Sequence, residues 1–195
     1  MTLIFATCNR NKLIEVQRIL GPDFKLILPS DLGYDEDIPE THFTIKDNAM
    51  EKASFVWDKF HQDCFADDTG LCVDYLNGAP GVYTARYAGE PKNPVENVKK
   101  ILREMEGVPF EQRTARFVCD IAYVCQGEML VFEGTCEGHI SFEPQGELGF
   151  GYDPVFIPEG MDRTMAMLSL TEKNAISHRG KAVDKFLCHL TGNRS

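Results

Sequence analysis

Apolar and polar positions in the first third of the chain follow two periods, which separate strands from helices. Short apolar runs at 3–6 and 24–28 predict strands on either side of a polar turn and a helix. That helix shows apolar residues at helical spacing and ends at Gly21-Pro22: Leu13, Val16, Ile19 and Leu20. A second apolar stripe predicts a helix over 45–60, with four charged residues off that face: Asp47, Glu51, Lys52 and Asp58.

The remaining two thirds of the chain continue the mixed pattern. A short buried strand is expected at 64–66, a helix over 95–105, and a long hairpin from 113–125 and 129–140 around Gln126-Gly127-Glu128. Segments 76–94 and 143–160 are rich in glycine and proline and are expected to be mostly irregular. The last helix carries apolar residues on one face: Ala182, Val183, Phe186, Leu187 and Leu190. With no repeat or linker, the pattern predicts one mixed α/β domain over residues 1–195.

Charge and composition narrow the function classes. The 195 residues include 20 Lys+Arg and 30 Asp+Glu, giving a formal net charge of −10. A negative field repels phosphate backbones, so no nucleic-acid partner is expected, although a local basic pocket or a bound cation still admits a phosphorylated small molecule. No apolar run reaches the length of a membrane span, and the first twenty residues do not resemble a signal peptide, so a cytoplasmic protein without a membrane partner is expected.

Seven cysteines, an odd number with no C-x-x-C spacing, support neither a disulfide framework nor a zinc site. Most lie in apolar runs, as in Phe117-Val118-Cys119, and are expected to be buried small hydrophobes in a reducing compartment.

The first candidate for chemistry is the polar turn between the first strand and the first helix. It contains six consecutive residues: Thr7, Cys8, Asn9, Arg10, Asn11 and Lys12. A helix that opens here points backbone N–H groups at an anion, and its dipole favours negative charge. The turn lacks the glycines of a Walker loop, and the alternative is an ordinary polar turn with solvated Lys and Arg.

The second candidate is Asp67-Asp68-Thr69-Gly70, which follows the buried strand Cys64-Phe65-Ala66. Two adjacent carboxylates at the mouth of a buried strand repel each other, so a bound cation is a natural partner. The alternative is a solvated turn.

Two further candidates lie in the second half of the chain. In Phe150-Gly151-Tyr152-Asp153-Pro154, aromatic residues beside glycine offer a stacking surface and Asp153 offers an acceptor, unless the aromatics only fill the interior. Segment 172–181 gathers four cationic or imidazole side chains within nine residues: Lys173, His178, Arg179 and Lys181. Such an island suits an anion site or a solvated helix start.

Taken in order, these blocks resemble the ITPase/HAM1-type pyrophosphatases of non-standard purine nucleoside triphosphates, from Leu3 to about Leu187. The turn at 7–12 is similar to that family's T-x-N-x-x-K, and Glu40-Thr41 with Asn48-Ala49 and Lys52-Ala53 resembles E-T-x₆-N-A-x₂-K-A. The blocks at 65–71, 78–87, 149–154 and 177–180 complete the resemblance.

The resemblance implies a two-lobed α/β fold with a long twisted mixed sheet and an active cleft between the lobes. It also implies a homodimer and Mg²⁺-dependent hydrolysis of ITP, dITP or XTP to the monophosphate and pyrophosphate, which would cleanse the nucleotide pool. Glu40 and Asp68 would hold Mg²⁺, and Asp68 would accept the proton from the attacking water, with Asp67 as an alternative base.

The resemblance further implies the substrate-binding residues. The turn at 7–12, Thr69 and Lys173 would take the phosphates and sugar. The base would lie near Phe150, Gly151 and Tyr152, with Asp153, His178 and Arg179 at its polar edge. A different phosphohydrolase, which would release inorganic phosphate, and a nucleotide-binding protein without activity remain as alternatives; the intact set Glu40, Asp68 and Lys173 argues against the second.

Overall fold

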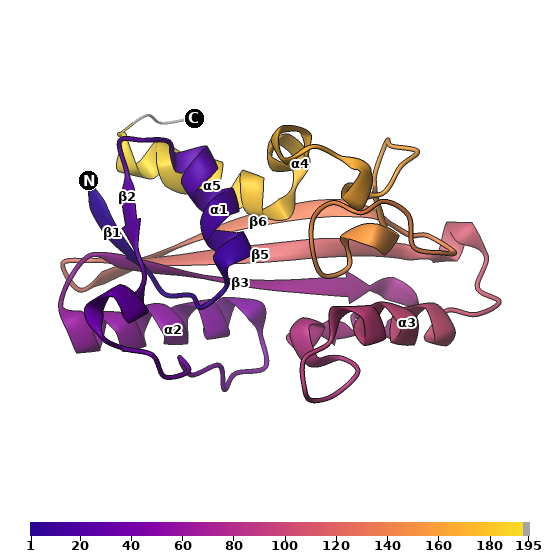
Figure 1. Cartoon of the computed structure of the whole chain (residues 1–195), viewed down its shortest axis with the longest axis horizontal. Helices are drawn as coiled ribbons and strands as arrows, with labels where there is room; N and C mark the ends of the chain where they lie inside the picture. Colours follow the sequence, from indigo (N-terminus) through magenta and orange to yellow (C-terminus); the bar gives the residue numbers. More distant parts are fainter. Residues whose placement is uncertain (193–195) are drawn as a thin grey trace. The chain divides into compact units, whose positions relative to one another are not determined.

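The computed structural model describes residues 1–192 and has a mixed α/β fold (Figure 1). Its described residues form seven strands: β1 (Thr2–Phe5), β2 (Lys25–Ile27), β3 (Cys64–Val73), β4 (Pro80–Gly81), β5 (Thr114–Cys125), β6 (Glu128–Ile140) and β7 (Phe156–Pro158). They also form five α-helices: α1 (Arg10–Leu20), α2 (Ile45–Phe60), α3 (Pro94–Glu104), α4 (Leu170–Ile176) and α5 (His178–Leu190). No helix among these residues combines the length and apolar composition that crossing a membrane requires.

The sheet contains both parallel and antiparallel pairs, which confirms the mixed α/β class. Its strand order is β2-β1-β3-β5-β6-β7, with β4 paired to β3. Strand β1 runs parallel to β2 and to β3, whereas β4 is antiparallel to β3 and β7 is antiparallel to β6. The order places β3 between β1 and β5, so the strand that carries the paired aspartates is flanked on both sides.

The predicted helices form for the reasons that the sequence gives. Helix α1 ends at Gly21, whose φ of 78° suits glycine, and α2 begins at Thr44, whose hydroxyl accepts from the backbone N–H of Asp47. The β5–β6 hairpin is also confirmed: Gln126 and Gly127, with φ values of 51° and 84°, make the two-residue connection.

Three details differ from the sequence-based expectations. The strand expected at 64–66 continues to Val73, so Asp67-Asp68-Thr69-Gly70 lies inside β3 and not in a turn. Helix α4 was not expected, although Ser169 and Glu172 form a capping box at its start. Strand β7 also interrupts the segment expected to be irregular.

The cysteines are less buried than expected. All seven are free, but only Cys64, Cys119 and Cys136 are fully buried, and Cys8 is exposed.

The described chain forms two compact units, and long strands contribute to both. Unit 1 comprises residues 1–68, 119–134 and 178–192, and unit 2 comprises residues 69–118 and 135–177. Each unit has a hydrophobic core of its own. The prediction of a single domain over residues 1–195 stays a prediction.

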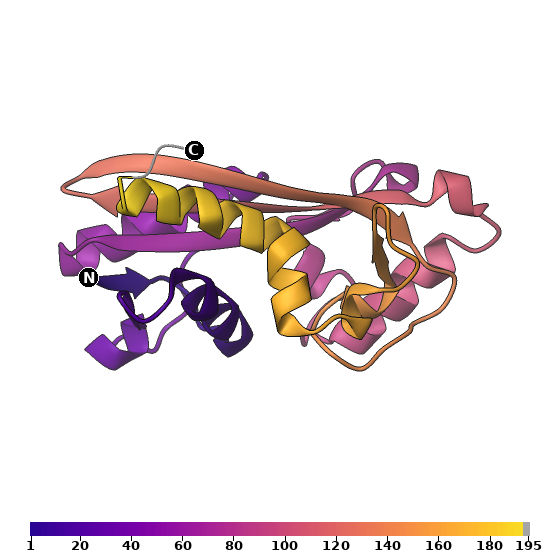
Figure 2. The same ribbon diagram turned by 90° about the horizontal axis from the view of Figure 1, so that it is seen from above.

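Unit 1 is a three-layer structure with one core on each face of its sheet. Figure 1 shows α2 on one side of β3 and α1 and α5 on the other, and Figure 2 shows α5 running along the β5–β6 hairpin. The core under α1 and α5 is built from Leu3, Phe5, Val16, Leu20, Phe65, Cys119, Ile121, Tyr123, Ala182, Val183 and Phe186. The core under α2 is built from Ile4, Ala6, Ala49, Ala53, Val56, Cys64, Ala66, Ala122 and Val124. Strand residues therefore alternate between the two faces, as the period of two requires.

Unit 2 packs α3 and the segments around β7 against its part of the sheet. Its core includes Val98 and Ile101 of α3, Tyr152 and Val155 before β7, and Phe156 in β7.

Candidate functional site

The alternation of side chains along β3 separates the two adjacent aspartates. Phe65 belongs to the core under α1 and α5, whereas Cys64 and Ala66 belong to the core under α2. Asp67 therefore points to the α1–α5 face and Asp68 to the α2 face. The two carboxylates lie in a strand and not in a turn, so they point to opposite faces of the sheet, and a bound cation as their partner stays a prediction.

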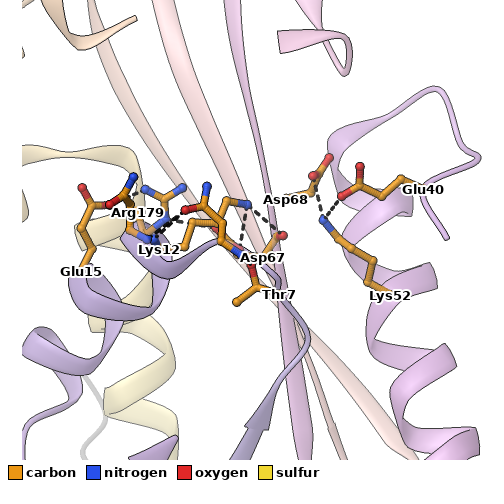
Figure 3. A network of polar contacts seen from close by, with 10 residues as sticks. Thr7, Lys12, Glu15, Glu40, Lys52, Asp67, Asp68 and Arg179 are labelled. Carbon is orange, nitrogen blue, oxygen red and sulfur yellow. Dashed lines mark hydrogen bonds and ion pairs between the residues drawn. The ribbon is translucent and has the colours of Figure 1, made fainter. Parts of the chain in front are cut away.

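Asp68 lies in a cluster with Glu40 and Lys52 on the α2 face (Figure 3). The ammonium Nζ of Lys52 donates to Oε1 of Glu40 at 2.6 Å and to Oδ1 of Asp68 at 2.9 Å. The Lys52 side chain is 6% exposed, against 12% for Asp68 and 36% for Glu40. One buried cation thus brings together the two carboxylates that the sequence predicts as metal ligands.

The charges of this cluster shift the affinities of its groups for protons. Burial lowers the pKa of Lys52, but Asp68 and Glu40 outweigh it and raise that pKa above its ordinary value. Burial raises the pKa of Asp68, and the attraction of Lys52 opposes this shift only in part. At neutral pH Lys52 is therefore a fixed positive charge between the two carboxylates.

Asp67 lies in a separate ion-pair cluster on the α1–α5 face (Figure 3). Its Oδ1 accepts from Nζ of Lys12 at 2.9 Å, and its Oδ2 accepts from Nε of Arg179 at 3.1 Å. The other side of the Arg179 guanidinium donates from Nη1 to Glu15. Burial raises the pKa of Asp67, but Lys12 and Arg179 outweigh it and hold that pKa well below its usual range.

These contacts make Asp67 a structural anion and a poor proton acceptor. Of the two candidate bases, Asp68 is the one that the geometry favours. Arg179 was predicted to contact the polar edge of the purine. Its Nε and Nη1 both donate to buried carboxylates in this structure, and its contact with the base stays a prediction.

The turn at 7–12 starts α1 but is already capped. The side-chain Oδ1 of Asn9 accepts from the backbone N–H of Asn11 at 2.9 Å and of Lys12 at 3.4 Å. The backbone N–H of Asn9 in turn donates to Oγ1 of Thr7 at 3.1 Å. The expectation that these backbone N–H groups are free is therefore wrong for Asn9, Asn11 and Lys12, and the contacts of these residues with substrate stay predictions.

A cavity of about 270 Å³ in unit 1 opens beside the same turn. Thr7, Cys8 and Arg10 line one part of it. Residues between β2 and α2 line the rest: Leu28, Pro29, Ser30, Tyr34, Asp35, Glu36 and Ile38. Three of the predicted phosphate-binding residues thus border a hollow in the surface of unit 1.

The predicted site residues of unit 2 form their own cluster. Asp153 and Lys173 make an ion pair of 2.7 Å between Oδ2 and Nζ, and both side chains are 4% exposed. The backbone N–H of Phe150 donates to the same Oδ2 at 2.8 Å, and Nζ of Lys173 lies 4.6 Å from the centre of the Phe150 ring. Gly149 lacks a side chain for a steric reason, because a Cβ there would lie 2.1 Å from Oδ2 of Asp153.

Other predicted residues have structural contacts. Tyr152 is buried in the core of unit 2 and donates from its hydroxyl to the carbonyl oxygen of Thr84 at 2.9 Å, so its ring offers no surface for stacking. Thr69 lies half-buried in β3, Gly151 has a φ of 65°, and His178 is buried at the first turn of α5. Their substrate contacts stay predictions.

Lys52 and Glu15 were not predicted as members of either cluster. Lys52 was expected off the apolar face of its helix, but it lies among the buried residues of α2 with Asn48, Ala49 and Ala53. The available signal was its spacing of three and four residues from Ala49 and Asn48. Glu15 precedes the buried Val16 on α1 and gave no comparable signal.

Glu40 and Asp68 fit Mg²⁺ by the chemistry of their donors. Both offer carboxylate oxygens, which a hard cation prefers, and both already converge on a positive charge. Within residues 1–192, no group of three or more His, Cys, Asp or Glu side chains is arranged to hold a metal ion. Two carboxylates are nevertheless a usual protein contribution to a Mg²⁺ site, with water and substrate completing the shell.

The fold and these clusters define an α/β protein whose central strand carries buried ion pairs on both faces. The Ham1 family model matches residues 3–189. A dITP/XTP pyrophosphatase of Flavobacterium johnsoniae is 46% identical over 194 residues, covering 100% of each chain, and one of Bacillus subtilis (strain 168) is 47% identical over 186 residues, covering 93% of each. The solved structures of Ham1 proteins from Staphylococcus aureus and Coxiella burnetii are each 38% identical, with TM-scores of 0.89 and 0.90. Coverage is 100% of both chains for the first, and 98% of this chain and 99% of the other for the second. The chain belongs to the Ham1 family.

Proposed function

We propose that this protein is a nucleoside triphosphate pyrophosphatase that hydrolyses dITP, ITP and XTP to the monophosphate and pyrophosphate. The relatives at 46–47% identity bear the name dITP/XTP pyrophosphatase. In a cell this activity would remove non-standard purine nucleotides from the precursor pool. The observation that carries the proposal is the convergence of Glu40 and Asp68 on one cation position in unit 1.

Glu40 and Asp68 are the residues that would hold Mg²⁺. When bound, Mg²⁺ supplies positive charge to the phosphates and makes a nearby water more acidic. Lys52 offsets one of the two carboxylate charges, and the remaining negative charge would repel a triphosphate, so a divalent ion also explains how a chain of net charge −10 accepts such a substrate.

The residues around Asp68 then account for the chemistry. In the proposed step a water oxygen attacks the α-phosphorus, the bond to the bridging oxygen breaks, and pyrophosphate leaves. The carboxylate of Asp68 accepts the proton of the attacking water, while Lys52 fixes the orientation of that carboxylate. Arg10 and Lys12 provide cationic side chains at the turn for the phosphates.

Product analysis tests the activity. Purified protein is incubated with ITP, XTP, dGTP and ATP, with Mg²⁺ and with an excess of chelator, and both pyrophosphate and inorganic phosphate are measured. We expect pyrophosphate from ITP and XTP, no turnover with chelator, and recovery when Mg²⁺ is restored. Inorganic phosphate as the first product would indicate a different phosphohydrolase, and full activity in chelator would refute the metal assignment.

We further propose a homodimer, which the resemblance implies. Light scattering at micromolar concentration should give twice the 22.0 kDa mass of one chain. A mass of one chain would contradict this.

A further inference from the structure

Asp120 on β5 is a buried carboxylate to which the proposed reaction gives no role. The residue is 3% exposed, and its Oδ1 has no hydrogen-bond partner among the residues that the structure describes. A buried acceptor without a donor costs about 1–3 kcal/mol, and more if it is charged. A carboxylate in this position therefore lowers the stability of the fold, and a ligand that donates to Oδ1 would remove this cost.

Asp120 lies on the same face of unit 1 as Asp68. Ala122 and Val124, which follow it by two and four residues, belong to the core under α2, and so do the residues that precede Asp68 at the same spacing on β3. Side chains two apart on a strand share a face, so both carboxylates belong to the α2 face. Strands β3 and β5 are neighbours in the sheet, and adjacent strands lie about 4.8 Å apart.

The charged groups around Asp120 come from three elements. Glu133 on β6 and Asp68 on β3 are negative, and Lys46 in the first turn of α2 is positive. Burial, with Glu133 and Asp68, raises the pKa of Asp120 to about 6 against the attraction of Lys46. Within unit 1 this carboxylate therefore feels the charge of a proposed metal ligand, although its Oδ1 has no donor of its own.

We infer that Asp120 is a positioning residue for the divalent cation of the Glu40–Asp68 site, to which its carboxylate is linked through water. Mg²⁺ held by one or two carboxylates keeps several waters, and each of these is a hydrogen-bond donor that seeks an acceptor. An orphaned carboxylate oxygen one strand away supplies such an acceptor. The cation would also relieve the repulsion between Asp68 and Asp120. The inference rests on the proposed function, because it concerns the same cation.

The test measures metal binding directly. Mn²⁺ alone is titrated into chelator-treated protein, and free Mn²⁺ is followed by electron paramagnetic resonance for wild type, Asp120→Asn and Asp120→Val. Loss of a partner outside the ligand shell weakens metal binding about 10- to 100-fold, so we expect Kd to rise in that range for Val. Asn keeps an acceptor oxygen but loses the charge and should fall between Val and wild type.

Two controls separate this role from a structural one. Glu133→Gln removes another negative charge that acts on Asp120, but from an exposed position, and should leave the Mn²⁺ affinity near wild type. Urea unfolding in chelator should show both Asp120 variants at least as stable as wild type, because each removes an orphaned buried carboxylate. This second measurement also shows that the variants fold.

The possible outcomes are distinct. Equal Mn²⁺ affinities for wild type and Asp120→Val, or an equal loss with Glu133→Gln, would overturn the inference and leave the metal assignment intact. Wild-type protein that binds no Mn²⁺ would refute the metal assignment, and the role of Asp120 with it. Weaker Mn²⁺ binding confined to the Asp120 variants, with a larger loss of affinity for Val than for Asn, supports the inference.

Discussion

Replacing Lys52 by Met removes the positive charge between Glu40 and Asp68 while keeping a side chain of similar length. In the wild-type protein the ammonium contacts both carboxylates, at 2.6 and 2.9 Å. In the variant two negative groups face each other, and Asp68 remains mostly buried. We therefore expect Lys52→Met to be strongly destabilised when no divalent ion is present.

The size of the effect follows from the burial of the three groups. Removing one partner of a buried ion pair costs about 3–5 kcal/mol, because the other charge is left without compensation. Water reaches part of the Glu40 side chain, which is 36% exposed, so the lower end of that range, about 3 kcal/mol, applies here. For a chain of this size, about 2–4 °C of Tm accompanies each kcal/mol, which gives a decrease of roughly 6–12 °C.

Divalent ions should reverse much of this loss. A ligand at 100 times its Kd stabilises the folded state by about 2.7 kcal/mol. Mg²⁺ should stabilise Lys52→Met more than wild type, because in wild type it competes with the ammonium for the same carboxylates. Thermal unfolding of both proteins is recorded with chelator and over a series of Mg²⁺ concentrations.

The control is Lys99→Met on α3, where an exposed lysine pairs with Glu96 at 2.8 Å. Such exposed pairs contribute at most about 1 kcal/mol, so this variant should unfold near wild type and show no added response to Mg²⁺. If Lys52→Met behaves like Lys99→Met, the ammonium does not compensate the two carboxylates, and the reasoning fails. Combining Lys52→Met with Asp68→Asn should restore part of the stability, with a coupling of about 0.5–3 kcal/mol.

Three further changes test other parts of the structure. Asp68→Asn should lower hydrolysis of ITP by at least about 10²-fold while the protein stays folded, because Lys52 keeps its contact with Glu40; near wild-type turnover would locate the reaction elsewhere. Gly134→Ala would place a Cβ 2.1 Å from the carbonyl oxygen of His178 and 2.5 Å from the backbone nitrogen of Ala182. Urea unfolding should therefore show a free energy of unfolding lower by about 1–3 kcal/mol or more. An unchanged midpoint would contradict the close approach of β6 and α5. Without metal, Asp120→Asn should be more stable than wild type above pH 6, and the gain should disappear as the pH falls toward 4, because the raised folded-state pKa of Asp120 destabilises the wild type only where the unfolded chain carries an ionised carboxylate. A gain that is independent of pH would show that folding does not raise the pKa of Asp120.

The sequence by itself determined the elements that depend on local patterns. The apolar stripes of α1 and α2 and their ends at Gly21 and Thr44 follow from helical spacing and from capping, which involve residues a few positions apart. The β5–β6 hairpin follows from two long apolar runs and a two-residue turn. The candidate segments were also visible from local composition: polar residues follow an apolar run at 7–12 and 67–70, aromatic residues lie beside glycine at 149–154, and cationic side chains gather at 172–181.

Only the tertiary structure decided how the charged residues pair. Two consecutive aspartates are compatible with a turn and with a strand. Asp67 and Asp68 point to opposite faces because β3 extends to Val73 and includes both of them. Arg179 pairs with an aspartate 112 positions earlier, and Lys52 with one 16 positions later. Such partners are chosen by which elements pack together, since an ion pair becomes strong only where burial has removed the water that would otherwise solvate both charges.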